Sequence, residues 1–247
     1  MVYFAADIHL GGGDERTAER TERRFLAWLD RVASDASAIC LAGDIFDFWF
    51  EVGDRIPDGF DRVLAKFREV TARGVELIFL PGNHDMWQNG HFERMCGMRV
   101  CPSPQLLEFY GQRIFVAHGD NMNIAGKPLL RLLNWCFRSR GLRWLFVHLV
   151  PYGRILRFGR WWSAGSRRKH GAVKNSAAVT EPLIAYARSY AATHRVDHFV
   201  FGHMHFPRDY RDGALHTVHL GEWTAEEAPS YAVLDDRGGL TLEKFEL

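Results

Sequence analysis

The sequence contains five short apolar segments, each followed by small residues and then by polar side chains. Each segment is rich in β-forming residues and stops at a turn signal, which predicts a buried strand. Five strands that all become polar at the same end predict one shared site. The segments are residues 2–6 before Asp7-Ile8-His9, 38–42 before Gly43-Asp44, 75–80 before Pro81-Gly82-Asn83-His84-Asp85, 114–117 before His118-Gly119-Asp120, and 199–201 before Gly202-His203-Met204-His205.

Two amphipathic helices are expected between the first three strands. Apolar residues recur at helical spacing over residues 16–34 and from Val63 to Val70, where Gly74 ends the second helix. Strands that alternate with helices predict βαβ units and a largely parallel sheet. The rest of the chain predicts a hairpin across Gly111-Gln112, a helix near 176–194, and short strands at 214–220, 230–235 and 239–246.

The composition is that of an ordinary soluble globular protein. Of the 247 residues, 47% are hydrophobic and 25% are charged, so we expect a single domain over residues 1–247. The N-terminus has no basic n-region, and no run of about 18 uncharged apolar residues occurs, so neither a secretory signal nor a membrane span is expected. The four cysteines lack CxxC spacing, which predicts reduced thiols in a cytoplasmic protein.

One segment is strongly basic. Between Asp120 and Glu181 the chain has twelve basic residues and no acidic one, while the rest carries 19 basic and 30 acidic residues. We expect residues 121–175 to form an inserted helical cap that meets something anionic. Its many Leu, Phe and Trp residues favour contact with an anionic membrane leaflet. A groove for single-stranded nucleic acid and a basic cap with a buried aromatic face remain open as alternatives.

The polar residues after the strands have the chemistry of a two-metal site. Two divalent cations about 3.5–4 Å apart need a bridging carboxylate and further ligands on each side. Mixed nitrogen and oxygen ligands suit Mn²⁺, Fe or Zn²⁺ better than Ca²⁺. The predicted ligands are Asp7, His9, Asp44, Asn83, His118, His203 and His205.

The order Asp-x-His, Gly-Asp, Gly-Asn-His-Asp, His-Gly-Asp and Gly-His-x-His resembles the calcineurin-like metallophosphoesterase family. The resemblance covers residues 7–205. It implies an α/β fold, a sandwich of two mixed β-sheets flanked by helices, with a dinuclear centre at the strand ends. It also implies that Asp44 bridges two metals, with Asp7, His9 and His205 on one and Asn83, His118 and His203 on the other.

This chemistry suits phosphoester hydrolysis. Metal binding lowers the pKa of water from about 15.7 towards 7, so a hydroxide shared by two cations would attack phosphorus near neutral pH. His84 follows the expected ligand Asn83, and we expect it to stabilise charge or to protonate the leaving oxygen, with Asp85 orienting its ring. The sequence has no GxSxG elbow, P-loop or GxGxxG fingerprint.

Residues 43–49 (Gly-Asp-Ile-Phe-Asp-Phe-Trp) and the insert after Asp120 resemble a subfamily, the UDP-2,3-diacylglucosamine diphosphatases of lipid A synthesis. One departure is His84, where many members have arginine. The resemblance implies hydrolysis of UDP-2,3-diacylglucosamine to UMP and 2,3-diacylglucosamine 1-phosphate, with two divalent ions, expected to be Mn²⁺. It also implies Ser166, Arg167 and Lys169 as substrate-binding residues. We expect a monomer that is cytoplasmic and peripheral at the inner membrane. The alternative is a generic cytoplasmic metallophosphodiesterase, nucleotide pyrophosphatase or nuclease.

Overall fold

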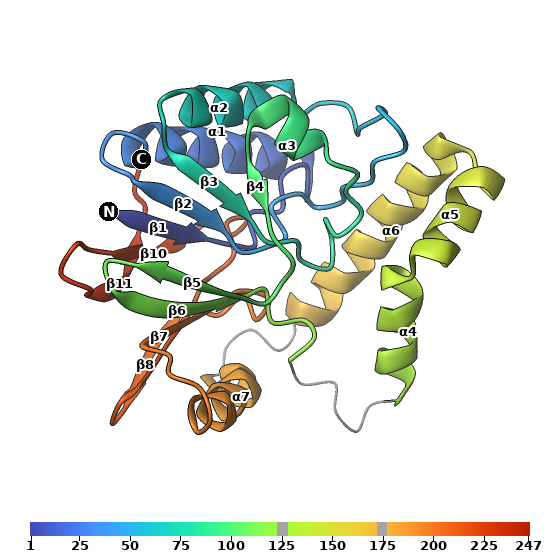
Figure 1. Ribbon diagram of the computed structural model, residues 1–247. Helices are drawn as coiled ribbons and strands as arrows, with labels where there is room; N and C mark the ends of the chain where they lie inside the picture. The colour runs from blue at the N-terminus through green and yellow to red at the C-terminus, as the bar shows by residue number, and fades with distance from the viewer. Residues whose placement is uncertain (123–127, 172–176) are drawn as a thin grey trace.

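Two β-sheets packed face to face form the centre of the protein, whose computed structural model describes residues 1–122, 128–171 and 177–247 (Figure 1). The six-stranded sheet has the spatial order β11 (Leu240–Lys244), β10 (Ser230–Leu234), β1 (Val2–Ala5), β2 (Ala38–Leu41), β3 (Glu76–Phe79) and β4 (Arg99–Val100). The five-stranded sheet has the order β5 (Gln105–Phe109), β6 (Gln112–Ala117), β7 (His198–Phe201), β9 (Leu215–His219) and β8 (Arg208–Asp212).

Helices cover the outer faces of both sheets. α1 (Glu15–Val32), α2 (Asp61–Ala72) and α3 (His91–Cys96) lie on the six-stranded sheet, and α7 (Glu181–Ala191) lies on the other (Figure 1). Side chains alternate along β1 as a strand requires: Val2 and Phe4 pack between the sheets, whereas Tyr3 packs against the helices. This arrangement confirms the predicted α/β sandwich of two mixed sheets.

The strands that precede the polar residues run parallel to one another. β1, β2 and β3 are parallel neighbours in one sheet, and β6, β7 and β9 are parallel neighbours in the other. Their carboxyl ends meet across the sandwich, because Nδ1 of His118 after β6 lies 3.1 Å from the carbonyl oxygen of Ala42 after β2. The shared edge that the sequence predicts is therefore present.

Some local predictions were wrong. The hairpin turns at Tyr110 and Gly111, both with positive φ, instead of Gly111-Gln112, because Phe109 pairs with Gln112. The helix expected near 176–194 is divided into the 3₁₀ helix η1 (Ala177–Thr180) and α7. The elements α3, β4 and β8 were not predicted, since the first two are too short to show a period and β8 is largely polar.

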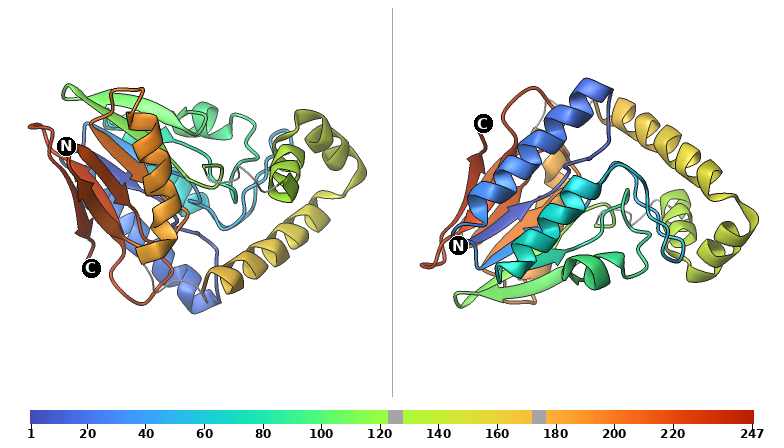
Figure 2. Two further views of the ribbon diagram at one scale, coloured as in Figure 1. Left: turned by 90° about the horizontal axis from the view of Figure 1, so that it is seen from below. Right: turned by 90° about the horizontal axis from the view of Figure 1, so that it is seen from above.

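Three helices between β6 and β7 stand apart from the sheets: α4 (Pro128–Arg138), α5 (Arg140–Leu149) and α6 (Tyr152–Gly171) (Figure 2). Residues 123–127 and 172–176 at the ends of the predicted 121–175 insertion lie outside the described residues, so its boundaries remain a prediction. Trp135, Trp144 and Trp161 are exposed, which does not fit the alternative of a buried aromatic face. Within the described ranges, no helix is both long and apolar enough to cross a membrane.

Candidate metal centre

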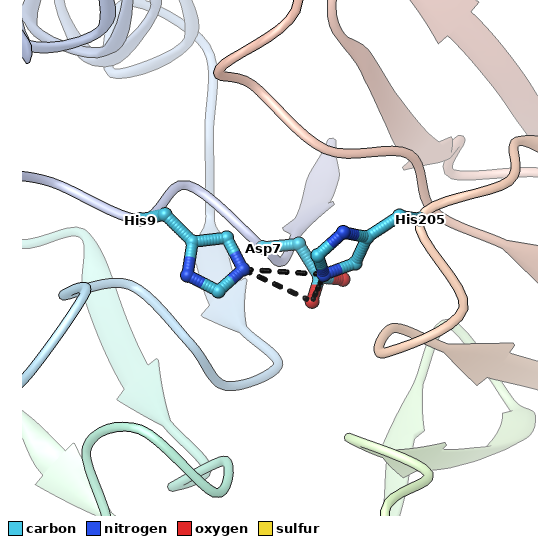
Figure 3. Close-up of side chains that lie close together, drawn as sticks. All are labelled: Asp7, His9 and His205. Atoms are coloured by element: carbon cyan, nitrogen blue, oxygen red, sulfur yellow. Dashed lines mark hydrogen bonds and ion pairs between the residues drawn. The ribbon is translucent and has the colours of Figure 1, made fainter. Parts of the chain in front are cut away.

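Asp7, His9 and His205 form a first cluster at the carboxyl ends of β1 and β7. Nε2 of His205 lies 3.2 Å from Oδ1 of Asp7 and 3.2 Å from Nε2 of His9 (Figure 3). Asp7 and His9 follow the same strand two residues apart, and both of their side chains are directed towards His205. These atoms lie close enough for one cation to contact all three residues.

A second cluster lies where β2, β3 and β6 end. Nε2 of His118 lies 3.2 Å from Oδ2 of Asp44 and 3.1 Å from Oδ1 of Asn83. The ring of His203 lies 5.1 Å from that of His118, and Asp44, His118 and His203 offer atoms within 4.8 Å of one another. The structure therefore brings together all seven residues that the sequence predicts as ligands.

Asp44 lies between the two clusters. Its Oδ2 is 4.0 Å from Nε2 of His9 in the first cluster and 3.2 Å from Nε2 of His118 in the second. Its Oδ1 accepts the backbone N–H of His84 at 2.9 Å, and Oδ2 of Asp7 accepts the backbone N–H of His203 at 2.8 Å. One oxygen of each carboxylate is thus held by the backbone, and the other is directed into the site.

The backbone at the site is unusual. Asp7, His9, Asp44, His203 and His205 all have φ between 52° and 69°, the left-handed region that side chains rarely adopt. Such conformations cost of order 1–3 kcal/mol each and cluster at functional sites. Left-handed turns at these strand ends redirect the chain so that the carboxylates and imidazoles converge.

The charges at the site are strongly coupled. Burial alone would lower the pKa of His118, but the Asp44 carboxylate outweighs burial and raises this pKa to about 10. Burial would likewise lower the pKa of His205, but the Asp7 carboxylate outweighs burial and raises this pKa to about 9. Burial lowers the pKa of His203 to about 3, so its imidazole stays neutral, the form that binds a metal.

The donor set fits divalent cations. Oδ1 of Asp7 is buried and forms no hydrogen bond with the described residues, although two imidazoles face it. Imidazole nitrogens, carboxylates and the amide oxygen of Asn83 match the ligands of Mn²⁺, Fe or Zn²⁺. A cation placed between these groups would contact the carboxylate oxygen together with both imidazoles.

Comparison with known proteins agrees with this geometry. The sequence matches the family model of the calcineurin-like phosphoesterases over residues 1–207. The chain belongs to this family. As a calcineurin-like phosphoesterase it is a metal-dependent hydrolase, and the prediction of an enzyme is confirmed.

Relatives of this phosphoesterase match along nearly the whole chain. It is 33% identical to the UDP-2,3-diacylglucosamine hydrolase of Porphyromonas gingivalis, with 99% of this chain and 97% of that protein covered. It is 27% identical to the protein of the same name from Actinobacillus succinogenes, with 90% and 91% covered. A solved archaeal phosphodiesterase, at 10% identity and a TM-score of 0.50 over 99% of both chains, shares the fold.

The structure assigns a different partner to the ring of His84 from the one the sequence suggested. Nδ1 of His84 lies 2.7 Å from the backbone carbonyl oxygen of Asp47. Asp85, the expected orienting group, instead accepts backbone N–H groups, from Gly82 and Ile45 at 2.7 Å each. The interpretation that Asp85 orients the ring of His84 was therefore wrong, because the Asp85 carboxylate instead connects the loops after β2 and β3 through hydrogen bonds to their backbone N–H groups.

Sequence reasoning missed two carboxylates beside the candidate ligands. Oε2 of Glu222 lies 3.0 Å from Nδ1 of His205, and Oδ1 of Asp47 lies 3.7 Å from Nδ1 of His9. Carboxylates in such positions orient metal-ligating imidazoles and raise their basicity. A signal existed for Glu222, which follows β9 and Gly221 in the same way that the predicted ligands follow their strands.

Replacing Gly82 with alanine is expected to displace Asp44. A Cβ at this position would collide with Oδ1 of Asp44 and lie 2.6 Å from its backbone nitrogen. We expect Gly82→Ala to lower the free energy of unfolding by about 1–3 kcal/mol and to reduce bound metal. Urea unfolding and metal analysis would measure both. Gly153→Ala, where a Cβ meets nothing within 4 Å and alanine favours the helix α6, should not lower the free energy of unfolding; equal losses in both variants would contradict the prediction.

His219 is expected to make stability depend on pH. It is buried in β9, and burial, with a smaller effect of Arg208, lowers its pKa from 6.5 to about 3. The unfolded chain therefore binds a proton at His219 more tightly than the folded chain does. The contribution of neutral His219 to the free energy of unfolding is complete above pH 6.5 and is lost as the pH falls. Between pH 8 and pH 5 His219 should account for about 2 kcal/mol of lost stability. Urea unfolding of His219→Gln should show a correspondingly smaller loss, and an unchanged loss would refute the assignment.

Proposed function

We propose that this phosphoesterase hydrolyses the pyrophosphate of UDP-2,3-diacylglucosamine, giving UMP and 2,3-diacylglucosamine 1-phosphate. The observation that carries the proposal is the 33% identity over essentially the whole length of a relative named for that substrate. The converging ligand set supports a reaction at phosphorus. The same relatives favour this substrate over the alternative of a generic phosphodiesterase or nuclease.

The proposed ligands divide between two ions, which we propose to be Mn²⁺. Asp7, His9 and His205 would hold one, Asn83, His118 and His203 the other, and Asp44 would contact both. When bound, these cations supply an acidified water and neutralise phosphate oxygens.

His84 would act on the leaving group. Its Nδ1 lies 2.7 Å from the carbonyl oxygen of Asp47, so Nδ1 donates there and Nε2 is directed towards the site, 3.8 Å from Oδ2 of Asp44. From this position the imidazole would stabilise charge or give a proton to the leaving phosphate oxygen. Asp85 would serve the same step indirectly by holding the loops after β2 and β3 together.

The test is hydrolysis by the purified protein with Mn²⁺ and detergent. UDP-2,3-diacylglucosamine should release UMP, and Mn²⁺ removal by a chelator should abolish the release. Bis(p-nitrophenyl) phosphate serves as a small phosphodiester that needs no lipid or nucleoside recognition. Good turnover of this diester without release of UMP would reject the substrate and favour the generic phosphodiesterase.

The three helices α4, α5 and α6 would bring the enzyme to its lipid substrate at the cytoplasmic face of the membrane. Their exposed apolar side chains support this: Leu129, Leu132, Trp135, Leu142, Leu145 and Leu149. Basic residues in the same segment would attract an anionic leaflet. We also propose that Ser166, Arg167 and Lys169 contact the sugar phosphate; their side chains lie outside the described residues. Flotation with phosphatidylglycerol vesicles should recover the protein, and pure phosphatidylcholine vesicles should recover much less.

A further inference from the structure

The loop of residues 222–227, between β9 and β10, places Glu222 against the proposed ligand His205. Oε2 of Glu222 lies 3.0 Å from Nδ1 of His205, whereas Nε2 of the same ring lies 3.2 Å from Oδ1 of Asp7 in the first cluster. Glu222 therefore contacts the nitrogen that the proposed cation would not use. The side chain of His205 is 6% exposed and that of Glu222 is 11% exposed, so little water screens the contact.

This contact controls what His205 can offer to a cation. A carboxylate beside Nδ1 favours the tautomer in which Nδ1 carries the proton. That tautomer leaves the lone pair of Nε2 free on the side of Asp7 and His9, each of which has an atom 3.2 Å away. The position of the ligand nitrogen thus depends on where the Glu222 carboxylate is held.

Trp223 anchors the start of the 222–227 loop to the core. Its backbone N–H donates to the carbonyl oxygen of Asp7 at 3.1 Å. Its indole is fully buried, with its centroid 5.8 Å from the ring of Phe25 and 5.5 Å from that of Trp28, both on α1. Because Glu222 immediately precedes Trp223, its backbone is tied to α1.

Two arginines of α1 hold the rest of the loop. Arg24 donates to the carbonyl oxygens of Ala225 and Glu226 at 2.7 Å each. Arg20 donates to the carbonyl oxygen of Thr224 at 2.7 Å and also pairs with the carboxylate of Glu226. The two arginines are four residues apart, so they lie on one face of the helix. Three successive carbonyl groups are bonded in this way, and the helix thereby fixes the path of the loop.

We propose that Arg20 and Arg24 are positioning residues for the candidate metal centre, which act on His205 through the loop that carries Glu222. This inference rests on the proposed ligand role of His205 but not on the identity of the substrate. The alternative is a structural role alone, in which the arginines stabilise the fold without changing how tightly a cation is bound.

The test measures metal affinity and folding stability separately on the purified full chain. Isothermal titration calorimetry with Mn²⁺ would give the affinities of the bound ions, and urea unfolding without Mn²⁺ would give the stability. We expect Glu222→Gln to weaken the binding of one Mn²⁺ by about 10–100-fold, the range for loss of a partner of a metal-ligating imidazole. Glu227→Gln is the matched control, since it removes the same charge from an exposed position of the same loop and should leave the affinity unchanged.

Arg24→Ala should weaken the binding of the same Mn²⁺ by at least about threefold, because fewer bonds then hold the loop. Arg20→Ala should act in the same direction, and it provides the test if Arg24→Ala does not fold. A double substitution examines the route. If Arg24 acts through Glu222, Arg24→Ala should add less than about twofold to the loss already caused by Glu222→Gln.

Three results would overturn the proposal. The first is a folded Arg24→Ala or Arg20→Ala protein that is less stable to urea but binds Mn²⁺ as the unmodified protein does. The second is an equal change of affinity in Glu222→Gln and Glu227→Gln, and the third is full additivity in the double substitution.

The outcome is separate from that of the substrate assignment. If Glu222→Gln and Arg24→Ala weaken Mn²⁺ binding but the unmodified protein does not cleave UDP-2,3-diacylglucosamine, the positioning role stands and the proposed function fails. If the lipid substrate is cleaved but neither substitution changes Mn²⁺ affinity, the proposed function stands and the positioning role is rejected.

Discussion

Asp44→Asn is expected to reduce phosphodiester hydrolysis by at least about 10³-fold, because the asparagine has no charge with which to join two cations. Oδ2 of Asp44 lies between His9 and His118. Burial alone would raise the pKa of this carboxyl, but His118 outweighs burial and holds the pKa well below its usual range. Loss of several kcal/mol of charge stabilisation corresponds to a rate change of this size. Metal analysis should find fewer ions per chain than in the unmodified protein.

The substitution is chosen so that the fold survives. An asparagine at position 44 keeps the volume of the side chain and an Oδ1 that accepts the backbone N–H of His84. Asp212→Asn is the matched control, since Asp212 is an exposed residue of β8 paired with Arg188. Full activity and full metal content in Asp44→Asn would show that the two clusters do not share this carboxylate.

Residues from both sheets make up the candidate metal centre. Asp7, His9 and Asp44 come from the six-stranded sheet, whereas His118 and His205 come from the five-stranded sheet. Packing of Val2, Phe4 and Ala6 against the second sheet sets the distance between the two groups of strand ends. The geometry of the candidate metal centre therefore depends on the core between the sheets, and substitutions deep in that core should alter metal affinity as well as stability.

Much of the site could be predicted because its signal is local. A strand shows in a short apolar run, and the residues after it show in the next few positions, so five segments were enough to predict the seven candidate ligands that the structure brings together. The strand ends meet because parallel strands share an edge, which is a property of the βαβ topology. The comparisons then confirmed the family that the five motifs indicated.

The features that were missed depend on contacts between distant segments. The ring of His84 is held by the backbone carbonyl oxygen of Asp47, and the sequence cannot indicate this contact because every residue has a backbone carbonyl. The sequence also gives no sign of the left-handed conformation of His203 and His205, because positive φ is usually marked by glycine and these residues are histidines. The contact between α5 and the core is likewise made by Arg143, which donates to the backbone carbonyl oxygens of Gln88 and Glu51, and no periodicity predicts such bonds.

His84→Ala is expected to leave the metal content unchanged and to reduce hydrolysis by about 10²–10⁴-fold, the range for loss of a general acid. The ring nevertheless lies near two proposed ligands, with its centroid 5.0 Å from that of His9 and Nε2 3.8 Å from Oδ2 of Asp44. Two roles are therefore compatible with its position, a ligand or a group that acts on substrate.

Metal analysis separates these roles. A ligand would lose bound metal together with activity, whereas a group that contacts only the substrate would lose activity alone. The leaving group provides a second criterion, because an acid matters less as the leaving oxygen becomes less basic. Bis(p-nitrophenyl) phosphate, with its weakly basic leaving group, should therefore be hydrolysed by His84→Ala with a smaller loss than a diester that has an alkyl leaving group. His194→Ala, at an exposed position after α7, is the control. Equal losses for both diesters, or a loss of metal, would remove His84 from the role of acid.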